Sequence, residues 1–343
     1  MDLEKLIDAK DLLTFSQNFN IRRTYLGDTL FPDMKTQNLK AEFYRRSDQR
    51  MLPTMAQVHA FDTEAHIGQR PTVEKTVFSK LLIKEKINVT ERAQQWLESG
   101  ATGADALKRY IFDDAGRLAE AVKTRTEVAK MEALCKGKIS INENAVKYEI
   151  DYHVPADNQK KFDWTDKTHD ILGDIQAIVD SARLAGQEVS QIITSTKVVA
   201  LLRKNEGIQT AIYSALGKGT YVSNSMLANL IKDMFGLTIT INDGYYQYEG
   251  AKGALTAKRY FDENKFVLCG TGALGALGVG VWGPTPEELQ AGPWTAKSQQ
   301  QFITITKWAT PDPVAVWTKA SGLFVPIIPN PNGLFINTIK LIA

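Results

Sequence analysis

The sequence has little cysteine, no long apolar run and almost no excess of charge of one sign. Its 343 residues include two cysteines, Cys135 and Cys269, which excludes a disulfide framework and a zinc site built from paired cysteines. Lys plus Arg number 41 and Asp plus Glu 39, a formal charge of +2. That balance argues against a dedicated nucleic-acid binder, whose affinity comes largely from neutralising phosphates. The hydrophobic fraction of 43% is ordinary for a globular protein.

Apolar runs are also short. No stretch approaches the roughly 20 apolar residues that span a bilayer. Residues 1–6 lack the basic start and continuous apolar run of a signal peptide. We therefore expect no membrane contact, and a chain that folds in a reducing compartment.

Residue patterns that carry catalysis are missing as well. The four histidines have no partner at metal-ligand spacing, and no H-E-x-x-H, P-loop or G-x-S-x-G motif occurs. Solvation or helix-end placement explains the carboxylate pairs, and both cysteines read as buried thiols rather than nucleophiles. The residues weighed are His59, His66, His153, His169, Asp113, Asp114, Glu287 and Glu288. We predict no catalytic residue, no metal site and no cofactor.

One literal motif match needs an explanation. Gly270–Gly275 reads G-x-G-x-x-G and follows a predicted strand, 265–269. In a dinucleotide-binding unit, such glycines let the backbone approach a pyrophosphate at a helix N-terminus. Here the following segment carries more glycines and ends at Pro284, so it predicts no stable helix. Close backbone packing is the preferred interpretation, and a dinucleotide-binding oxidoreductase is the alternative.

The first 90 residues predict extended structure after one short helix. Residues 2–19 have an amphipathic pattern, and 21–32 read as an extended arm stopped by proline. Strand candidates follow at 39–44, 57–61 and 73–87, with no helix to cover them. Because a lone two-stranded ribbon is marginal in water, either a later part of the chain or another subunit must cover it.

Charged side chains gather on this ribbon. They either discourage uncontrolled strand pairing or form salt bridges with an acidic surface of a neighbouring subunit. We leave both interpretations open. The candidate inter-subunit contacts are Arg45, Arg46, Arg70, Glu74, Lys75, Lys80 and Lys84.

A long helix is the clearest predicted element. From 102 to 136, apolar residues recur at spacings of three or four and no proline interrupts. At about 1.5 Å per residue this gives a rod of roughly 50 Å. The other side of the helix is charged, and we expect it to be solvated.

Beyond this helix the composition changes twice. Residues 138–152 predict a hairpin with an Asn-centred turn, and 170–244 a compact mixture of helices and strands. The tail from residue 284 holds eight of the twelve prolines. We expect it to return as short strands, 302–308, 314–319 and 323–328, and to pack beside the long helix.

This order of parts resembles the major capsid proteins of tailed bacteriophages, in the lambda-like branch (phage major capsid protein E). Three segments are similar to that branch at residue level: 26–32 (LGDTLFP), 136–139 (KGKI) and 275–288, which ends in T-P-E-E. The resemblance implies an α+β Hong Kong 97-type fold with an N-terminal arm, an extended loop, a spine helix, a peripheral domain and an axial domain. The corresponding residues are 1–35 for the helix and arm, 36–88 for the extended loop, 89–164 plus 296–343 for the peripheral domain, and 165–295 for the axial domain.

The function implied by the resemblance is structural. Such a chain would assemble as pentamers and hexamers into an icosahedral shell that encloses packaged double-stranded DNA. Its implied partners are other copies of itself, a separate scaffolding protein, a portal protein, a decoration protein and non-specific contacts with the packaged DNA. Assembly would take place in the cytoplasm of the bacterial host, and the product would be a virion capsid. An encapsulin-like compartment that stores cargo enzymes is the alternative with the same fold.

Overall fold

The computed structural model describes residues 23–46, 52–68, 70, 73–91, 95, 103–144, 146–214, 220–250, 253–270, 276–289, 296–300, 302–312 and 314–341. The chain forms two compact units, which are described separately. The first contains Met1–Ala41, Val77–Lys130 and Val279–Ile327. The second contains Glu42–Thr76, Met131–Gly278 and Ile328–Ala343. The predicted helix at 2–19 lies outside the described residues.

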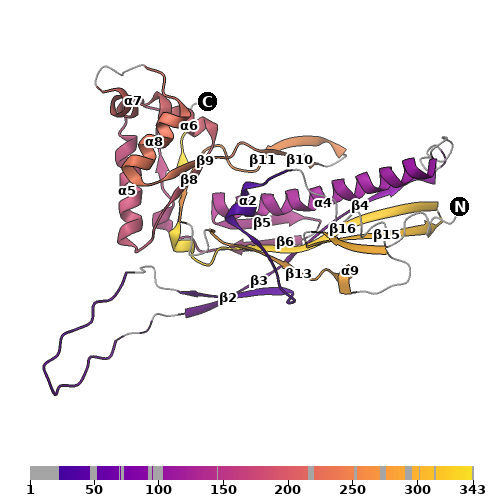
Figure 1. The fold of residues 1–343 in the computed structure, drawn as a ribbon, viewed down its shortest axis with the longest axis horizontal. Coiled ribbons are helices and arrows are strands. Elements are labelled where there is room, and N and C mark those ends of the chain that lie inside the picture. The colour runs from indigo at the N-terminus through magenta and orange to yellow at the C-terminus, as the bar shows by residue number, and fades with distance from the viewer. Residues whose placement is uncertain are drawn as a thin grey trace. The chain divides into compact units, whose positions relative to one another are not determined.

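The first unit is built on a six-stranded sheet around one long strand, β16 (Val314–Ile327). Strand β4 (Leu81–Val89) runs antiparallel along one edge of β16. On the other edge lie β15 (Ile303–Pro311) and β13 (Val279–Gly283). Strand β14 (Ala296–Gln300) pairs with β15, and β1 (Asp33–Lys35) runs parallel to β13. Figure 1 shows these strands with helix α4 running beside them.

Helix α4 (Gly103–Lys136) is the long helix that the spacing predicts. Where its side chains are described, the predicted apolar positions are buried: Ala115, Leu118, Val122, Ala129 and Ala133. At Gly322 of β16, an added Cβ would lie 2.9 Å from Trp282 and 3.1 Å from Val122 of the helix. The returning tail therefore packs beside this helix, as expected, and glycine permits the close approach.

The second unit has a five-stranded sheet in the order β7 (Lys161–Phe162), β17 (Leu334–Ile339), β12 (Lys265–Cys269), β8 (Gln191–Thr194) and β9 (Thr238–Ile241). Four helices pack with it, and a side-chain cap begins each of them. They are α5 (Ile171–Leu184), α6 (Thr196–Lys204), α7 (Glu206–Tyr213) and α8 (Asn224–Phe235). The shared core includes Trp164, Ile178, Leu202, Ile231 and Phe266.

Three two-stranded ribbons complete the described structure. They are β2 (Lys40–Arg46) with β3 (Val73–Ser79), β5 (Lys138–Glu143) with β6 (Val146–Asp151), and β10 (Tyr245–Glu249) with β11 (Leu255–Arg259). The β5–β6 ribbon confirms the predicted hairpin, with Asn144 at a φ of 49° in its turn. The remaining elements are the short helices α2 (Leu26–Leu30) and α9 (Pro286–Leu289), and the 3-10 turns η1 (Ala156–Asn158) and η4 (Pro331–Gly333).

Four local expectations are wrong. Residues 26–30 are helical, because Leu30 and Phe31 are buried and the Gly27 N–H bonds to a side chain of α4. Residues 57–61 form no strand and pair with none. The run 73–87 breaks at Lys80 into β3 and β4, because Lys80 is held by its own hydrogen bonds. The two strands expected within 314–328 are one, since β4 pairs with β16 from Val316 to Phe324 without interruption.

The pairing of β4 with β16 shows that a later part of the chain covers one of the predicted ribbon strands. Strand β4 is covered on one edge by the tail of its own chain. The β2–β3 ribbon and the residues 52–68 between its strands receive no such strand among the described residues.

Candidate functional site

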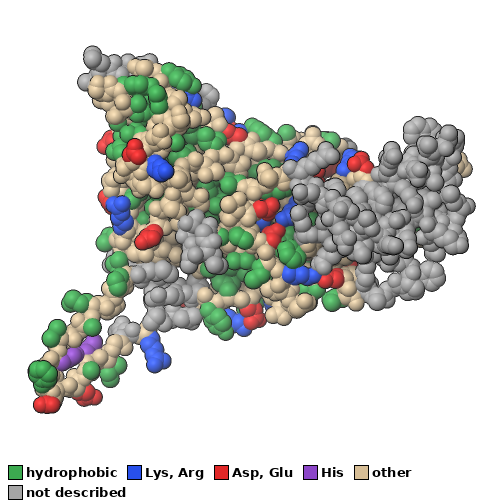
Figure 2. Space-filling model, in the orientation of Figure 1, with side chains coloured by type: hydrophobic (Ala, Val, Ile, Leu, Met, Phe, Trp, Pro, Cys, Tyr) green, Lys and Arg blue, Asp and Glu red, His purple; other side chains and the backbone are tan. Residues whose placement is uncertain are grey.

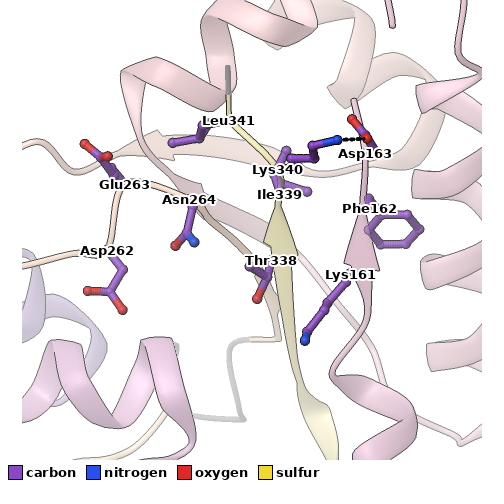
Figure 3. Close-up of a pocket in the computed structure, with 10 residues that line it drawn as sticks. All are labelled: Lys161, Phe162, Asp163, Asp262, Glu263, Asn264, Thr338, Ile339, Lys340 and Leu341. Atoms are coloured by element: carbon purple, nitrogen blue, oxygen red, sulfur yellow. Dashed lines mark hydrogen bonds and ion pairs between the residues drawn. The ribbon is translucent and has the colours of Figure 1, made fainter. Parts of the chain in front are cut away.

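An open groove of about 670 Å³ lies beside β7 and β17 (Figure 3). Its lining includes Lys161, Asp163, Asp262, Glu263 and Lys340. Lys340 forms an ion pair of 2.7 Å with Asp163. Hydrogen bonds from Lys340 and Thr165 lower the pKa of Asp163 to about 2. This carboxylate is therefore ionised at neutral pH and paired with Lys340, so it has no proton to donate as a general acid.

Burial makes the two thiols unreactive. Cys135 and Cys269 are both buried, as the sequence predicts. Burial raises the pKa of each to about 12. Since the thiolate is the reactive form, neither is available for nucleophilic chemistry at neutral pH.

Three of the four histidines are exposed, and the fourth contacts a carboxylate. His59, His66 and His153 are exposed, as expected for ribbon and loop residues. His169 lies 2.7 Å from Asp174, whose carboxylate also accepts a hydrogen bond from the Trp164 indole. Within the described ranges, no three His, Cys, Asp or Glu side chains are grouped as a metal site requires. No described helix is long and apolar enough to cross a lipid bilayer.

The most unusual surface is the segment 52–68, which we call the tip loop. It lies between β2 and β3 and has no regular secondary structure apart from a turn at 61–62. Its large apolar side chains are almost fully in solvent: Val58 and Phe61 are 99% exposed, Met55 89% and Ile67 85%. Figure 2 shows hydrophobic side chains in solvent along this loop. Such a cluster is typical of a surface that another protein covers.

The tip loop is also acidic. It contains Asp62 and Glu64 but no lysine or arginine. Hydrogen bonds within the loop join the Thr63 hydroxyl to the Ala60 carbonyl at 2.8 Å and the His66 backbone N–H to His59 Nε2 at 3.3 Å. An apolar, acidic loop with no core of its own cannot stabilise itself by burial. Contact with a partner would bury it.

The predicted contact residues are spread along the ribbon that carries this loop. Lys75 pairs with Glu42 at 2.6 Å across the ribbon, and this hydrogen bond raises the pKa of Lys75. Glu74 is exposed on β3, Arg70 is exposed near the tip loop, and Lys84 is exposed on β4. Arg45 and Arg46 lie in β2, but their side chains are outside the described part.

Lys80 differs from the expectation of an exposed charge. It is only 7% exposed, and burial lowers the pKa of its ammonium group. Its Nζ donates to Thr36 Oγ1 at 2.6 Å, to the Asn38 carbonyl at 2.5 Å and to the Trp282 carbonyl at 3.1 Å. Lys80 therefore fixes the base of the ribbon within its own chain.

A second group of charges lies where the sequence predicts a solvated helix face. Lys123 and Lys130 of α4 are 4% and 0% exposed, and Asp114 and Glu127 are buried too. Lys123 reaches Asp33 at 2.6 Å, and Lys130 reaches Asp28 at 2.8 Å and Asp33 at 3.2 Å. The prediction is wrong here because the arm 26–35 covers this face and brings carboxylates of its own.

Glu127 differs from Asp28 and Asp33 because it forms no ion pair among the described residues. Glu127 Oε1 accepts the Gly27 N–H at 3.0 Å, while its Oε2 has no hydrogen-bond partner. Burial raises the pKa of Glu127 to about 7, against the opposing effects of the Gly27 N–H and Lys130. Burial would also raise the pKa of Asp33, but Lys130 and Lys123 hold it below its ordinary value. The spacing of Lys123, Glu127 and Lys130 places all three on one face, and this signal could have been recognised.

Only Gly270 of the glycine-rich motif is described, and there close packing explains the glycine. Gly270 lies where an added Cβ would be 1.9 Å from the Glu188 carbonyl oxygen, so close backbone packing requires glycine there. Residues 271–275, the rest of the motif, lie outside the described residues.

Comparisons with known proteins agree with a structural role. A family model described as "Phage major capsid protein E" matches residues 8–339. A search of curated protein sequences finds no match. A protein assigned as the capsid protein of a prophage in Escherichia coli CFT073 is 18% identical, with a TM-score of 0.61 over 97% of this chain and 99% of that one.

Two further solved structures show the same fold at low identity. A phage-related protein from Bordetella bronchiseptica RB50 is 10% identical, with a TM-score of 0.52 over 95% of each chain. A structure from Mycobacterium phage Cain is 13% identical, with a TM-score of 0.50 over 98% of this chain and 99% of that one. The fold is therefore of the Hong Kong 97 capsid type, and the chain belongs to the phage major capsid protein E family.

Proposed function

We propose that this chain, a shell-forming capsid protein by family, closes as pentamers and hexamers into an icosahedral bacteriophage head around packaged double-stranded DNA. The observation that carries the proposal is the tip loop, whose apolar side chains are 85–99% exposed at Met55, Val58, Phe61 and Ile67 in the isolated chain. A loop of this composition needs a partner surface, and in a closed symmetric assembly every copy supplies one.

Two other features support a shell rather than a catalyst. The buried thiols and the paired carboxylate of the groove offer no reactive group. The formal charge of +2 lets a shell enclose DNA without binding its phosphates tightly. The division into an arm of 1–35, an extended loop of 36–88, a peripheral domain and an axial domain is part of this proposal. So are the contacts made by Arg45, Arg46, Arg70, Glu74, Lys75 and Lys84, the place of assembly in the host cytoplasm, and the scaffolding, portal and decoration partners.

The test is assembly of the purified chain, alone and with a candidate scaffolding protein, followed by sedimentation velocity and negative-stain electron microscopy. We expect closed shells, or discrete pentamers and hexamers. Replacing residues 52–68 by a short Gly-Ser linker should leave a folded subunit that forms no shells, because the loop contributes nothing to either core. Thr54→Ser is the matched control within the loop and should assemble as the unmodified chain does.

The outcomes separate the alternatives. A stable monomer or dimer under both conditions would contradict the proposal. If the linker variant unfolds, the loop belongs to the subunit's own core and the supporting argument fails. Shells from the native source that carry protein cargo and no DNA would favour the encapsulin-like alternative.

A further inference from the structure

Two carboxyl groups, one from the arm and one from α4, hold helix α2 against α4. Lys130 of α4 pairs with Asp28 Oδ1 of α2 at 2.8 Å, and Lys123 lies 3.4 Å from the same oxygen. The Gly27 N–H of α2 donates to Glu127 Oε1 of α4 at 3.0 Å. The Asp28 side chain is 41% exposed, so it loses little of its pairing energy when it returns to water.

The charges that face Glu127 balance without it. Lys123 and Lys130 belong to α4 itself, Asp28 comes from α2, and Asp33 comes from β1. Asp33 pairs with Lys123 at 2.6 Å and with Lys130 at 3.2 Å. Two ammonium groups and two carboxylates carry no net charge, so an ionised Glu127 would add an uncompensated buried anion.

The surroundings of Glu127 also favour its neutral form. From the sheet, the ring centroid of Trp282 lies 5.7 Å from the Lys123 ammonium and that of Phe324 lies 5.5 Å from the Lys130 ammonium. Glu127 is only 3% exposed, and its Oε2 has no hydrogen-bond partner. Burial accordingly raises its pKa to about 7. Below that pH the group is docked against α2 as the uncharged acid.

Helix α4 carries an alternative partner for its own lysines. Lys123 lies four residues before Glu127 and Lys130 three residues after it, so the three side chains share one side of the helix. At these spacings, lysine and an ionised glutamate attract each other on an exposed helix. An ionised Glu127 therefore competes with Asp28 for Lys130, and water reaches it when α2 moves away from α4.

We propose that α2 is a proton-operated latch: neutral Glu127 keeps α2 docked through the Asp28–Lys130 pair, and ionised Glu127 takes over Lys130 and releases α2. The residues after α2 stay in place, because Phe31 is fully buried and β1 pairs with β13. Leu30 of α2 is buried as well, so the open form is a minor population that hydrogen exchange can detect.

The direction of the pH effect follows from the bound proton. The docked form binds a proton that the open form releases, so docking is strongest at low pH and weakens as pH rises towards about 7. The latch goes beyond the proposed function and operates in the unassembled chain. Its failure would leave the proposed shell role untouched.

Amide hydrogen exchange with mass spectrometry measures the opening in the purified, unassembled chain. The protection factor, which is corrected for the intrinsic exchange rate at each pH, should fall about tenfold or more for residues 24–31 between pH 5 and pH 8. Amides of β16 that pair with β4 should keep their protection, because the opening is local. Glu127→Gln is neutral at both pH values and should hold residues 24–31 within about twofold. Glu132→Gln, whose native side chain pairs with Lys136, is the matched control and should behave as the unmodified chain does.

Asp28→Asn tests the competition itself. This change removes the arm carboxylate that pairs with Lys130 and that raises the pKa of Glu127. The fall in protection should therefore level off at a lower pH than in the unmodified chain. Levelling off at the same pH would overturn the exchange of partners. This variant and the pH profile of the unmodified chain keep the proposal testable if Glu127→Gln fails to fold.

Three further results would overturn the latch. Unchanged protection of residues 24–31 from pH 5 to pH 8 would show that no opening depends on this proton. An equal loss of protection in β16 would show that pH acts on the whole unit rather than on α2. A Glu127→Gln variant that keeps the pH dependence of the unmodified chain would assign the proton to another group.

Discussion

At the scale of single residues, the most informative group is the set of charges between the arm and α4. Two lysines and two aspartates balance one another, while Glu127 is buried with one oxygen unpaired. Removing one partner from such a group costs more than the group contributes, because it leaves an uncompensated buried charge. Because burial raises the pKa of Glu127 to about 7, this group carries a proton in the folded chain at pH values below about 7.

Glu127 predicts a pH dependence. Its folded-state pKa of about 7 lies above the ordinary value of 4.5, so between these pH values the folded chain binds more protons than the unfolded one. The free energy of unfolding should then fall as pH rises through this window, by at most about 3 kcal/mol from this group. Glu127→Gln should flatten the fall, measured by urea unfolding at pH 5 and pH 8. Glu120→Gln on the same helix is the control, and an unchanged slope in Glu127→Gln would refute the assignment.

Gly27 predicts a steric effect at the same place. An added Cβ would lie 2.1 Å from Glu127 Oε2 and 2.8 Å from Lys130 Cδ. Gly27→Ala should lower the free energy of unfolding by about 2 kcal/mol or more, because buried charged groups must move. Gly68 has no atom within 4 Å of its added Cβ, so Gly68→Ala should have little effect. Equal urea midpoints for the two variants would contradict this prediction.

At the scale of elements, the joint between β3 and β4 is where a predicted single strand becomes two. The backbone N–H of Lys80 bonds to the Leu39 carbonyl, and its ammonium bonds to three oxygens of the first unit. These bonds fix Lys80, at the base of the ribbon, within the first unit, whereas no strand or helix covers the tip loop among the described residues. This contrast suits a ribbon that presents the loop to another copy.

The joint can be tested separately from the loop. Lys80→Met removes this donor from the Asn38 carbonyl and the Thr36 hydroxyl, whereas the Trp282 carbonyl still accepts the Thr36 N–H. The change should cost about 2 kcal/mol of unfolding free energy. Lys84→Met removes an exposed lysine and should change stability by less than about 0.5 kcal/mol. Thermal unfolding of both variants measures the difference. Similar losses would mean that Lys80 does not fix the ribbon.

At the scale of the whole molecule, the near-neutral charge predicts weak DNA binding by the unassembled chain. With no large excess of cations, we expect only non-specific association that disappears between about 50 and 200 mM salt. Fluorescence anisotropy with a labelled duplex of arbitrary sequence measures this. Tight binding that survives 200 mM salt would show a dedicated nucleic-acid site and would contradict the proposed role of the charge balance.

Family membership and fold are also properties of the whole chain, and much of both could be predicted. Local residue patterns predict the order of the parts: arm, ribbon, long helix, hairpin, mixed α/β segment and returning tail. The spacing from 102 to 136 predicts α4 almost to the residue, and the Asn-centred hairpin forms where expected. Helix α7, the β10–β11 ribbon and β17 have weaker local signals and were not predicted.

The sequence by itself therefore determined what depends on neighbours along the chain: the long helix, the hairpin, the lack of catalytic patterns and the order of parts that indicates a capsid protein. Only the tertiary structure decided which charges are buried, because Lys123, Glu127 and Lys130 lose their water only when residues about 100 positions away cover them. The tertiary structure also decided that Lys80 is buried, because its ammonium bonds to the distant Trp282 carbonyl. It likewise decided that β16 is one strand, because β4 pairs along it. Periodicity shows which residues share a face, whereas contacts between distant segments decide whether that face meets water, its own chain or another copy.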